Sequence, residues 1–191
     1  MAVHLTKIYT RTGDDGTSGL GDFSRVAKTD PRLVAYADAE EANAAIGVAL
    51  ALGALPEDVA TVLRRVQNDL FDVGADLCTP IAQQGPTHTP LRITDGYVTR
   101  LEGWCDGFNA ELSKLDSFIL PGGTPGAALL HTARVVVRRA ERSTWAVMEA
   151  DPDGTNPITA RYLNRLSDLL FILGRKANPD GDVLWKPGGE R

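Results

Sequence analysis

The sequence predicts an all-α protein built as a bundle of five helices. Along its 191 residues, apolar side chains recur mostly at helical spacing, and Pro and Gly mark the breaks between these stretches. Strand signals are weak, because only Ile8-Tyr9 and Ser117 to Leu120 form short candidates. With 43% hydrophobic residues, the chain can bury a full core as one domain. We therefore expect a single domain over residues 1–191, with an N-terminal segment (1–29), a helical bundle (30–178) and a C-terminal tail (179–191).

Capping residues and prolines mark where the helices begin. Asp30-Pro31 opens the first helix, and Thr124-Pro125 opens the fourth. Three prolines between residues 79 and 93 predict a loop, and a turn over residues 151–157 precedes the last helix. The expected helices cover residues 33–52, 56–76, 94–108, a stretch from 125 to that turn, and 158–177.

Three arginines share one face of the fourth predicted helix. At about 100° per residue, Arg134, Arg138 and Arg142 fall within about 80° of one another, with Glu141 at the edge of that arc. The same helix carries apolar residues on an adjoining arc, so the arginines lie at the margin of a buried face. Such a stripe suits a polyphosphate. The alternative is a solvated basic face neutralised by carboxylates of neighbouring helices.

The N-terminal segment resembles an anion-binding loop in composition. Four glycines fall within the nine residues from Gly13 to Gly21, beside several threonines and Ser18. Glycine lets backbone N–H groups turn toward a phosphate, and hydroxyls add donors. The recognised motifs fail, however, because Asp22 stands where a Walker sequence requires Lys. A phosphate cradle and a flexible surface turn both remain open.

Charge and composition exclude several classes of protein. The net charge of −5 argues against nucleic acid as a partner. The chain has no apolar signal sequence, no apolar run of transmembrane length and only two cysteines, so we expect a reduced cytoplasmic protein without a membrane partner. A ferritin-like di-iron bundle requires Glu-x-x-His pairs, and alanine stands three residues before His131. His131 is therefore expected to pack between helices or to lie at the edge of a ligand site.

Four segments together resemble the PduO-type corrinoid adenosyltransferases. They are residues 7–16 (KIYTRTGDDG), 118–123 (FILPGG), 133–142 (ARVVVRRAER) and 162–168 (YLNRLSD), in the order that the family has them. The resemblance implies transfer of the 5′-deoxyadenosyl group of ATP to cobalt(I) of a corrinoid such as cob(I)alamin, with triphosphate as the leaving group. It also implies a five-helix bundle, a homotrimer, and an active site at each subunit interface.

The resemblance assigns roles to individual residues. Arg134, Arg138 and Phe118 would be catalytic, with Phe118 helping to exclude the lower axial ligand from cobalt(II). Arg134 would pair across the interface with Glu40, where the family usually has Asp. Mg²⁺ is expected because a triphosphate needs more positive charge than the side chains provide, and Glu141 would hold an arginine or a magnesium-bound water. The residues implied to bind ATP are Thr10, Arg11, Thr12, Gly13, Thr17, Ser18, Gly19, Lys28, Arg138, Arg139, Ala140, Glu141, Arg142 and Asn164.

A competing class is a non-catalytic ATP-binding regulatory bundle. Such a protein would keep the glycine loop and the arginines but would lack a hydrophobic seat for the corrin. Phe118, Leu120 and the apolar tail residues 183–185 favour the enzyme. The family can also hand its product to an adenosylcobalamin-dependent mutase, so delivery to such a mutase is a third alternative that the sequence leaves open.

Overall fold

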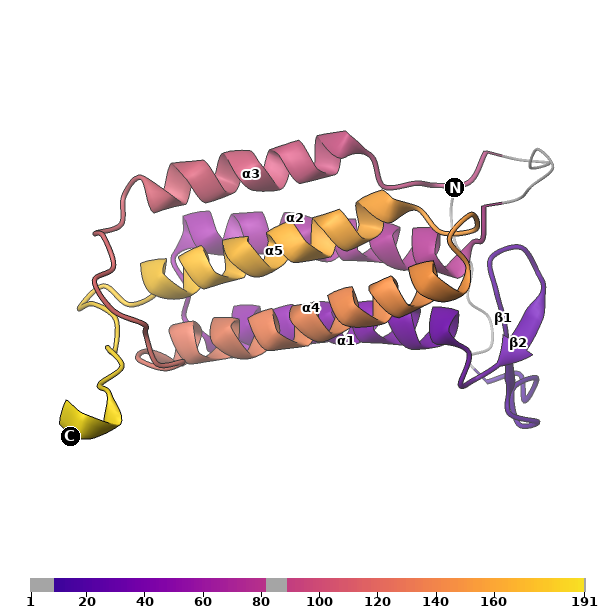
Figure 1. Cartoon of the computed structure of the whole chain (residues 1–191), viewed down its shortest axis with the longest axis horizontal. Helices are drawn as coiled ribbons and strands as arrows, with labels where there is room; N and C mark the ends of the chain where they lie inside the picture. The colour runs from indigo at the N-terminus through magenta and orange to yellow at the C-terminus, as the bar shows by residue number, and fades with distance from the viewer. Residues whose placement is uncertain (1–8, 82–88, 191) are drawn as a thin grey trace.

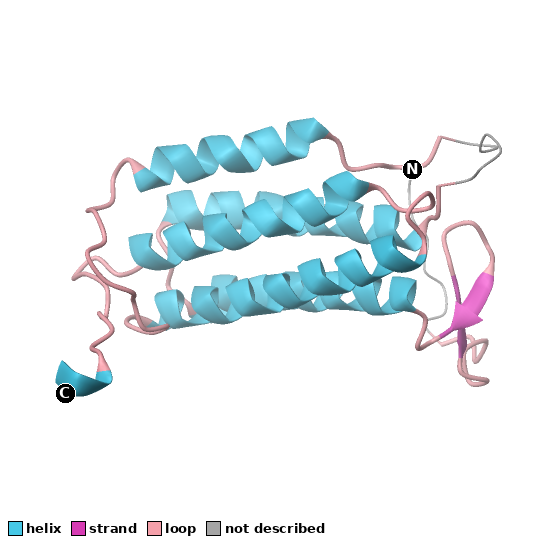
Figure 2. Ribbon diagram, viewed as in Figure 1, coloured by secondary structure: helices cyan, strands magenta, loops and turns pink. Residues whose placement is uncertain are grey.

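The prediction of an all-α, five-helix bundle is confirmed. The structure is a computed structural model, and it describes residues 9–81 and 89–190. A small two-stranded sheet precedes the helices, and a short 3₁₀ turn follows them (Figures 1 and 2). The strands are β1 (Thr17–Gly19) and β2 (Arg25–Ala27), the helices are α1 (Pro31–Leu52), α2 (Glu57–Cys78), α3 (Asp95–Asn109), α4 (Pro125–Ala150) and α5 (Pro157–Lys176), and the 3₁₀ turn is Gly188–Glu190.

The helices begin where the sequence predicts them. Asp30 accepts a hydrogen bond from the backbone N–H of Arg32 at 2.8 Å, and a proline occupies the first turn of α1. Thr124 caps α4 in the same way through Ala127 N–H at 3.1 Å. These bonds satisfy backbone donors that a helix start leaves without an internal partner. The predicted loop over 79–93 is seen at residues 79–81 and 89–93, while residues 82–88 lie outside the described part.

The core lies between the helices, with α4 packed antiparallel against both α1 and α5, and with α3 lying along α5 in the same direction (Figure 1). Alanines are frequent on the facing sides of α1 and α4, where small side chains let two helices approach closely. The fully buried ones are Ala35, Ala39, Ala42 and Ala49 on α1, and Ala127, Ala133 and Ala140 on α4. None of the helices described is both long and apolar enough to cross a membrane.

The strand prediction was wrong. Tyr9 is not in a strand, and Ile8 lies outside the described residues. The segment from Ser117 to Leu120 forms only an isolated bridge, Ile119 with Leu184. The sheet instead pairs Thr17 with Ala27 in antiparallel register. Strands of three residues within a glycine-rich stretch carry too little alternation to be recognised from sequence.

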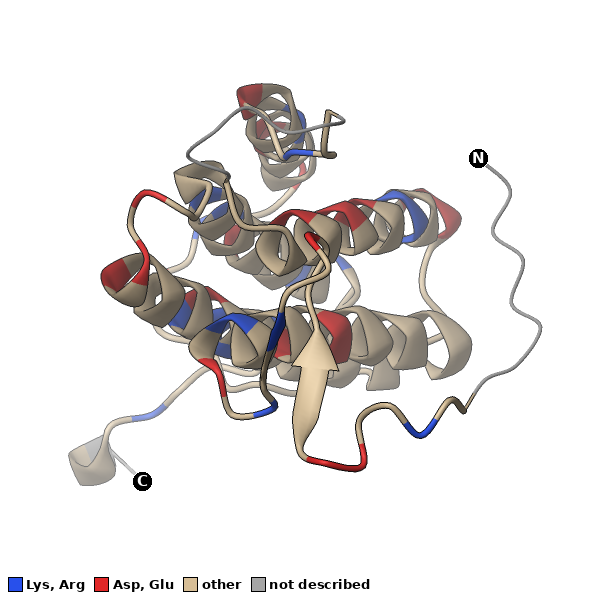
Figure 3. Cartoon of the chain, turned by 90° about the vertical axis from the view of Figure 1, so that its right-hand side faces the viewer, with Lys and Arg blue, Asp and Glu red and all other residues tan. Residues whose placement is uncertain are grey.

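A buried arginine holds the end of the bundle on which this hairpin rests. Arg32 donates to the carbonyl oxygens of Leu77 (2.9 Å) and Gly154 (3.1 Å) and to Asp151 Oδ2 (2.7 Å). It thereby ties the start of α1 to the end of α2 and to the turn between α4 and α5. Figure 3 looks onto this end and shows the hairpin in front of the helices, with basic and acidic positions interspersed.

The hairpin docks on this platform through Gly21. Its backbone N–H donates to the carbonyl oxygen of Cys78 at 2.8 Å, and a Cβ added to Gly21 would overlap the Thr79 hydroxyl. A larger residue at position 21 would therefore have to displace the Thr79 side chain. The loop that precedes α4 and the C-terminal tail lie at the opposite end of the bundle (Figure 1).

Candidate active site

The glycine-rich loop gathers hydroxyls and an ammonium group around Gly13. The hydroxyl oxygens of Thr10 and Thr12 lie 2.9 Å apart. The backbone N–H of Lys28 donates to the Gly16 carbonyl oxygen at 2.9 Å, and Lys28 Nζ lies 3.2 Å from the place that a Cβ on Gly13 would take. Glycine at position 13 therefore leaves room beside the Lys28 ammonium, as an anion cradle requires. Lys7, at the start of the matching motif, lies outside the described residues.

Arg25 shapes this loop, although sequence reasoning missed it. Its guanidinium donates to the Thr12 carbonyl oxygen and, at 2.6 Å, to Thr17 Oγ1, and it lies 3.7 Å from Asp15. Asp15 also accepts from the Thr17 N–H (3.0 Å) and hydroxyl (2.7 Å), and the hydroxyl bond lowers the pKa of the Asp15 carboxyl. Ser18 and Gly19 complete β1, where Gly19 pairs with Arg25. Nothing local in the sequence could reveal this contact, because it depends on the hairpin.

The arginine stripe of α4 is open to solvent beside a buried face. Arg138 and Arg142 are exposed, and neither guanidinium makes a hydrogen bond or an ion pair with any residue that the structure describes. The adjoining arc of Leu130, Ala133, Val137 and Ala140 is fully buried, as predicted. Neutralisation by neighbouring carboxylates, the alternative for this face, is therefore not seen at these two arginines.

The neighbouring positions 139 and 140 face other parts of the molecule. Arg139 pairs with Glu41 and, at 3.5 Å, with Asp38, both on α1. These ion pairs raise the pKa of Arg139, chiefly through the bond to Glu41. The Ala140 side chain lies wholly in the core. The structure thus brings Arg138 and Arg142 together on one surface and directs Arg139 and Ala140 away from it.

Glu141 and Asn164 meet across α4 and α5. The Asn164 amide donates to Glu141 Oε1 at 3.1 Å, although 23 residues separate the two in the chain. Glu141 lies between Arg138 and Arg142 on the same helix, so a carboxylate and an amide border the stripe. No group of three or more His, Cys, Asp or Glu side chains within residues 9–81 and 89–190 could hold a metal ion. A divalent cation here would need most of its ligands from a bound phosphate.

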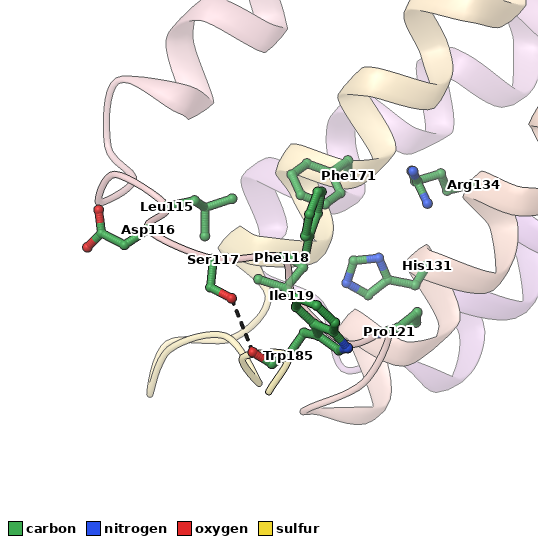
Figure 4. A pocket seen from close by; sticks show the side chains of 10 residues that line it. All are labelled: Leu115, Asp116, Ser117, Phe118, Ile119, Pro121, His131, Arg134, Phe171 and Trp185. Carbon is green, nitrogen blue, oxygen red and sulfur yellow. Dashed lines mark hydrogen bonds between the residues drawn. The ribbon is translucent and has the colours of Figure 1, made fainter. Parts of the chain in front are cut away.

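An open cavity of about 750 Å³ lies at the other end of the bundle (Figure 4). It brings Phe118, from the loop before α4, together with Arg134 on α4. The Phe118 ring meets the Trp185 ring edge-on, with centroids 6.0 Å apart, and the Arg134 guanidinium lies 5.5 Å from the centre of the Phe171 ring. The lining residues are Leu115, Asp116, Ser117, Phe118, Ile119, Pro121, His131, Arg134, Phe171 and Trp185.

The C-terminal tail builds one wall of this cavity. Trp185 N–H donates to the Phe118 carbonyl oxygen at 2.8 Å, and Leu120 N–H donates to the Val183 carbonyl oxygen at 2.7 Å. Phe118 is 79% exposed even so, which excludes a role in core packing within the single chain. An apolar ring held in the open by two backbone bonds is suited to contact a ligand. We call residues 117–120 and 183–185 the lower ribbon.

His131 and Phe171 form the wall opposite the lower ribbon. The two rings meet edge-on, with centroids 6.1 Å apart, and His131 is 3% exposed. Burial lowers the pKa of the His131 imidazole, and Arg134 lowers it further, against an opposing effect of Asp182. A neutral imidazole leaves Arg134 as the fixed cation among the lining residues. Sequence reasoning did not single out Phe171, because an aromatic residue in an apolar helix resembles any core residue.

Gly123, the second glycine of the pair before α4, is needed for backbone geometry. Gly123 has φ of +101°, and a Cβ added there would overlap the side-chain amide of Asn178. Asn178 accepts from Thr124 N–H at 2.9 Å and donates to the Gly122 carbonyl oxygen at 3.1 Å. This one side chain thus joins the cavity loop to the end of α5.

We predict that Gly123→Ala lowers the free energy of unfolding by about 1–3 kcal/mol, because alanine is strained at this φ and displaces Asn178. Urea denaturation measures the change. Gly122→Ala is the matched control, since no atom of a described neighbouring residue lies within 4 Å of its added Cβ and its φ is not positive. That control should stay within about 0.5 kcal/mol of the parent protein. Equal effects of the two substitutions would contradict the assigned geometry.

The two halves of the candidate site are far apart within one chain. The hairpin packs beside Val147 near the C-terminal end of α4, whereas the cavity reaches Arg134 in its N-terminal half. These positions lie about 20 Å apart along the helix axis. Glu40 is exposed on α1 and makes no ion pair with a described residue, Arg134 included. The expected pairing of Glu40 with Arg134 therefore does not form within the chain.

Comparisons with known proteins agree on one family. The family described as "Cobalamin adenosyltransferase" matches residues 8–177. A corrinoid adenosyltransferase of Mycobacterium tuberculosis (strain ATCC 25618 / H37Rv) is 69% identical over 191 residues, covering 100% of this chain and 98% of the relative. A cobalamin adenosyltransferase of Cupriavidus metallidurans is 46% identical, covering 97% of each chain.

A solved structure shows the same architecture. It is a variant of the PduO-type ATP:corrinoid adenosyltransferase from Lactobacillus reuteri, complexed with cobalamin and ATP. It superposes with a TM-score of 0.86 and 32% sequence identity, covering 94% of this chain and 97% of the other.

Proposed function

This chain belongs to the cobalamin adenosyltransferase family and is a corrinoid adenosyltransferase that uses ATP, and from that premise we propose which residues hold each substrate. The corrin occupies the cavity between the lower ribbon and α4. The triphosphate of ATP lies along Arg138 and Arg142. One observation carries this assignment: Arg134 lines the apolar cavity, and the two unpaired arginines continue from it along the same helix.

The glycine-rich loop that completes each ATP site belongs to a neighbouring subunit. Within one chain the hairpin and the cavity are separated by about 20 Å of α4, so the loop of a second copy is needed to bring bound ATP to the corrin. Thr10, Thr12 and the backbone around Gly13 provide donors, and the Lys28 ammonium adds charge. A homotrimer with one site at each interface is the assembly that we propose, with the Glu40 carboxylate of one subunit paired with the Arg134 guanidinium of the next.

The reaction needs positioning more than acid–base chemistry. Cobalt(I) carries the electron pair that forms the bond to C5′ of the ribose, while the bond from C5′ to the triphosphate oxygen breaks and its electrons leave with the triphosphate. Negative charge therefore grows on the leaving group. Arg138, Arg142 and Lys28 stabilise that charge through bonds that strengthen as the transition state is reached.

The lower ribbon acts at an earlier step. A cobalt(II) corrinoid accepts an electron more readily when no base or water occupies its lower face. The Phe118 ring covers that face, and Trp185 supports it edge-on at 6.0 Å. The lowered pKa of His131 favours its neutral form, so it adds little positive charge to this apolar surface.

Mg²⁺ would balance part of the triphosphate charge. The protein offers Glu141 beside the stripe, oriented by the 3.1 Å bond from Asn164. One carboxylate fits a magnesium ion that is held mainly by phosphate oxygens and water. The residues present are therefore consistent with Mg-ATP as the bound form of the nucleotide.

The direct test is to incubate the protein anaerobically with ATP and chemically reduced cob(I)alamin, with and without Mg²⁺. We expect the light-sensitive spectrum of adenosylcobalamin and an equal amount of free triphosphate, both greatly reduced without the metal ion. No spectral change in the complete mixture would overturn the assignment of the site, and unchanged turnover without Mg²⁺ would remove the metal ion from it.

We predict that Arg134→Ala weakens assembly as well as activity, because its guanidinium faces both the cavity and the proposed Glu40 of another subunit. Light scattering should show a smaller mass at low protein concentration. Glu40→Gln should reproduce the loss of mass without altering the cavity. A trimer of unchanged stability in both variants, with normal turnover, would remove the interface role of this pair.

A further inference from the structure

Arg175, near the end of α5, touches both segments that carry the lower ribbon. Its Nε donates to Asp182 Oδ2 at 2.8 Å, and its terminal nitrogen donates to the Ser113 carbonyl oxygen at 2.8 Å. Ser113 precedes the segment 117–120 that carries Phe118, and Asp182 directly precedes the tail residues 183–185. One guanidinium therefore fastens both halves of the lower ribbon to the bundle.

The ion pair between Arg175 and Asp182 is removed from solvent. The side chain of Arg175 is 6% exposed and that of Asp182 is 9% exposed. A tight turn aims the carboxylate inward, with the Gly181 N–H donating to the Asn178 carbonyl oxygen at 3.0 Å and Gly181 at φ of +100°. A charge in such a place is strongly destabilising when its partner is removed, so the pair holds the tail firmly.

The lower ribbon has little else to hold it. Phe118 is mostly exposed, and Leu184 and Trp185 are about half exposed. Its two segments bond mainly to each other, through the backbone pairs at Phe118 and Leu120. Two segments that pair with each other stay over the cavity only if at least one is fixed to the helices. Arg175 fixes both.

We propose that Arg175 and Asp182 are positioning residues that set the place of the Phe118 ring below the corrin. This inference rests on the proposed function of Phe118. Neither residue lines the cavity, so both act through the lower ribbon. Arginine is suited to the position because its planar fork reaches a carboxylate and a carbonyl oxygen together, which a single ammonium group does less well.

Asp182→Asn tests the proposal, and its unfolding temperature is measured beside its activity because the substitution leaves the buried Arg175 guanidinium without its carboxylate. The asparagine amide has nearly the same shape as the aspartate carboxylate, but it lacks the negative charge that pairs with the Arg175 guanidinium. We expect turnover from cob(II)alamin with a reductant to fall on the order of tenfold, while turnover from ready-made cob(I)alamin and the KM for ATP stay within about twofold. Electron paramagnetic resonance of the cobalt(II) complex with ATP should show less of the form without a lower ligand.

Glu111→Gln is the matched control. Glu111 pairs with Lys176, so this ion pair also joins the loop after α3 to the end of α5, but it is exposed and does not reach the tail. Its loss should leave both activities unchanged. Arg175→Lys should resemble Asp182→Asn, whereas Asp182→Glu, which keeps the charge, should restore part of the activity from cobalt(II).

The possible outcomes separate this inference from the proposed function. If Phe118→Ala impairs the cobalt(II) reaction and Asp182→Asn does not, the positioning role is wrong and the assignment of Phe118 stands. Equal losses of Asp182→Asn from cobalt(II) and cobalt(I), or an equal loss in Glu111→Gln, would also overturn the positioning role. If Phe118→Ala itself has no effect on the cobalt(II) reaction, the proposed function of the lower ribbon fails first.

Discussion

Replacing Arg138 with alanine should abolish turnover and leave the assembly intact. The guanidinium of Arg138 is exposed and makes no ion pair within the described residues, so its removal breaks no contact that holds the bundle together. A charge-assisted bond to a phosphate contributes about 1.5–3 kcal/mol, and the charge on the leaving triphosphate grows as the reaction proceeds. Loss of one such donor typically lowers kcat by about 10²–10³.

The measurement is kcat with cob(I)alamin and saturating Mg-ATP, together with the molecular mass and the thermal unfolding temperature of each variant. Arg64→Ala is the control, because Arg64 is exposed on α2 and, among the residues that the structure describes, forms an ion pair only with Glu57 on its own helix. Nearly normal activity of Arg138→Ala would place the stripe outside the site. A collapse of assembly would instead show that Arg138 is an interface residue.

The bundle and the stripe could be predicted from sequence because local patterns determine them. Helical spacing of apolar residues, a cap at Asp30 and a cap at Thr124 specify where α1 and α4 begin, and the structure has both caps. The phase of Arg134, Arg138 and Arg142 relative to the apolar arc follows from the helix period alone. Burial of Ala133 and Val137 then confirms which side faces the core.

The other parts of the candidate site depend on contacts between segments that are distant in sequence. Arg25 reaches Thr17 only because a short hairpin forms, and Trp185 reaches Phe118 because the tail folds back along residues 118–120. Phe171 resembles a core residue until the cavity beside it is seen. Such contacts leave no periodic signal in the sequence. The family resemblance could therefore identify Phe118 and Arg134, but the sequence could not predict the other residues that line the cavity.

Replacing Phe118 with alanine should separate the reduction of cobalt(II) from the transfer of the adenosyl group. Without the ring, water or the corrinoid's own base can return to the lower face of the corrin, and cobalt(II) becomes harder to reduce. We expect turnover from cob(II)alamin to fall roughly 100-fold, which corresponds to about 2.7 kcal/mol of barrier. With cob(I)alamin supplied ready-made, the nucleophile already exists and no lower ligand has to leave, so the loss should be much smaller.

Stability and ATP affinity provide the internal checks on that result. Phe118 is 79% exposed, so its truncation leaves no cavity in the core and the unfolding temperature should hardly change. ATP affinity should also persist, because the ring lies in the apolar cavity with Trp185 and not on the open stripe of Arg138 and Arg142. Phe71→Ala, at an equally exposed phenylalanine on α2 outside the cavity, controls for the loss of surface aromatic area. Equal losses from cobalt(II) and cobalt(I), or a collapse of ATP binding, would mean that Phe118 serves the site as a whole and does not act on the lower face of the corrin.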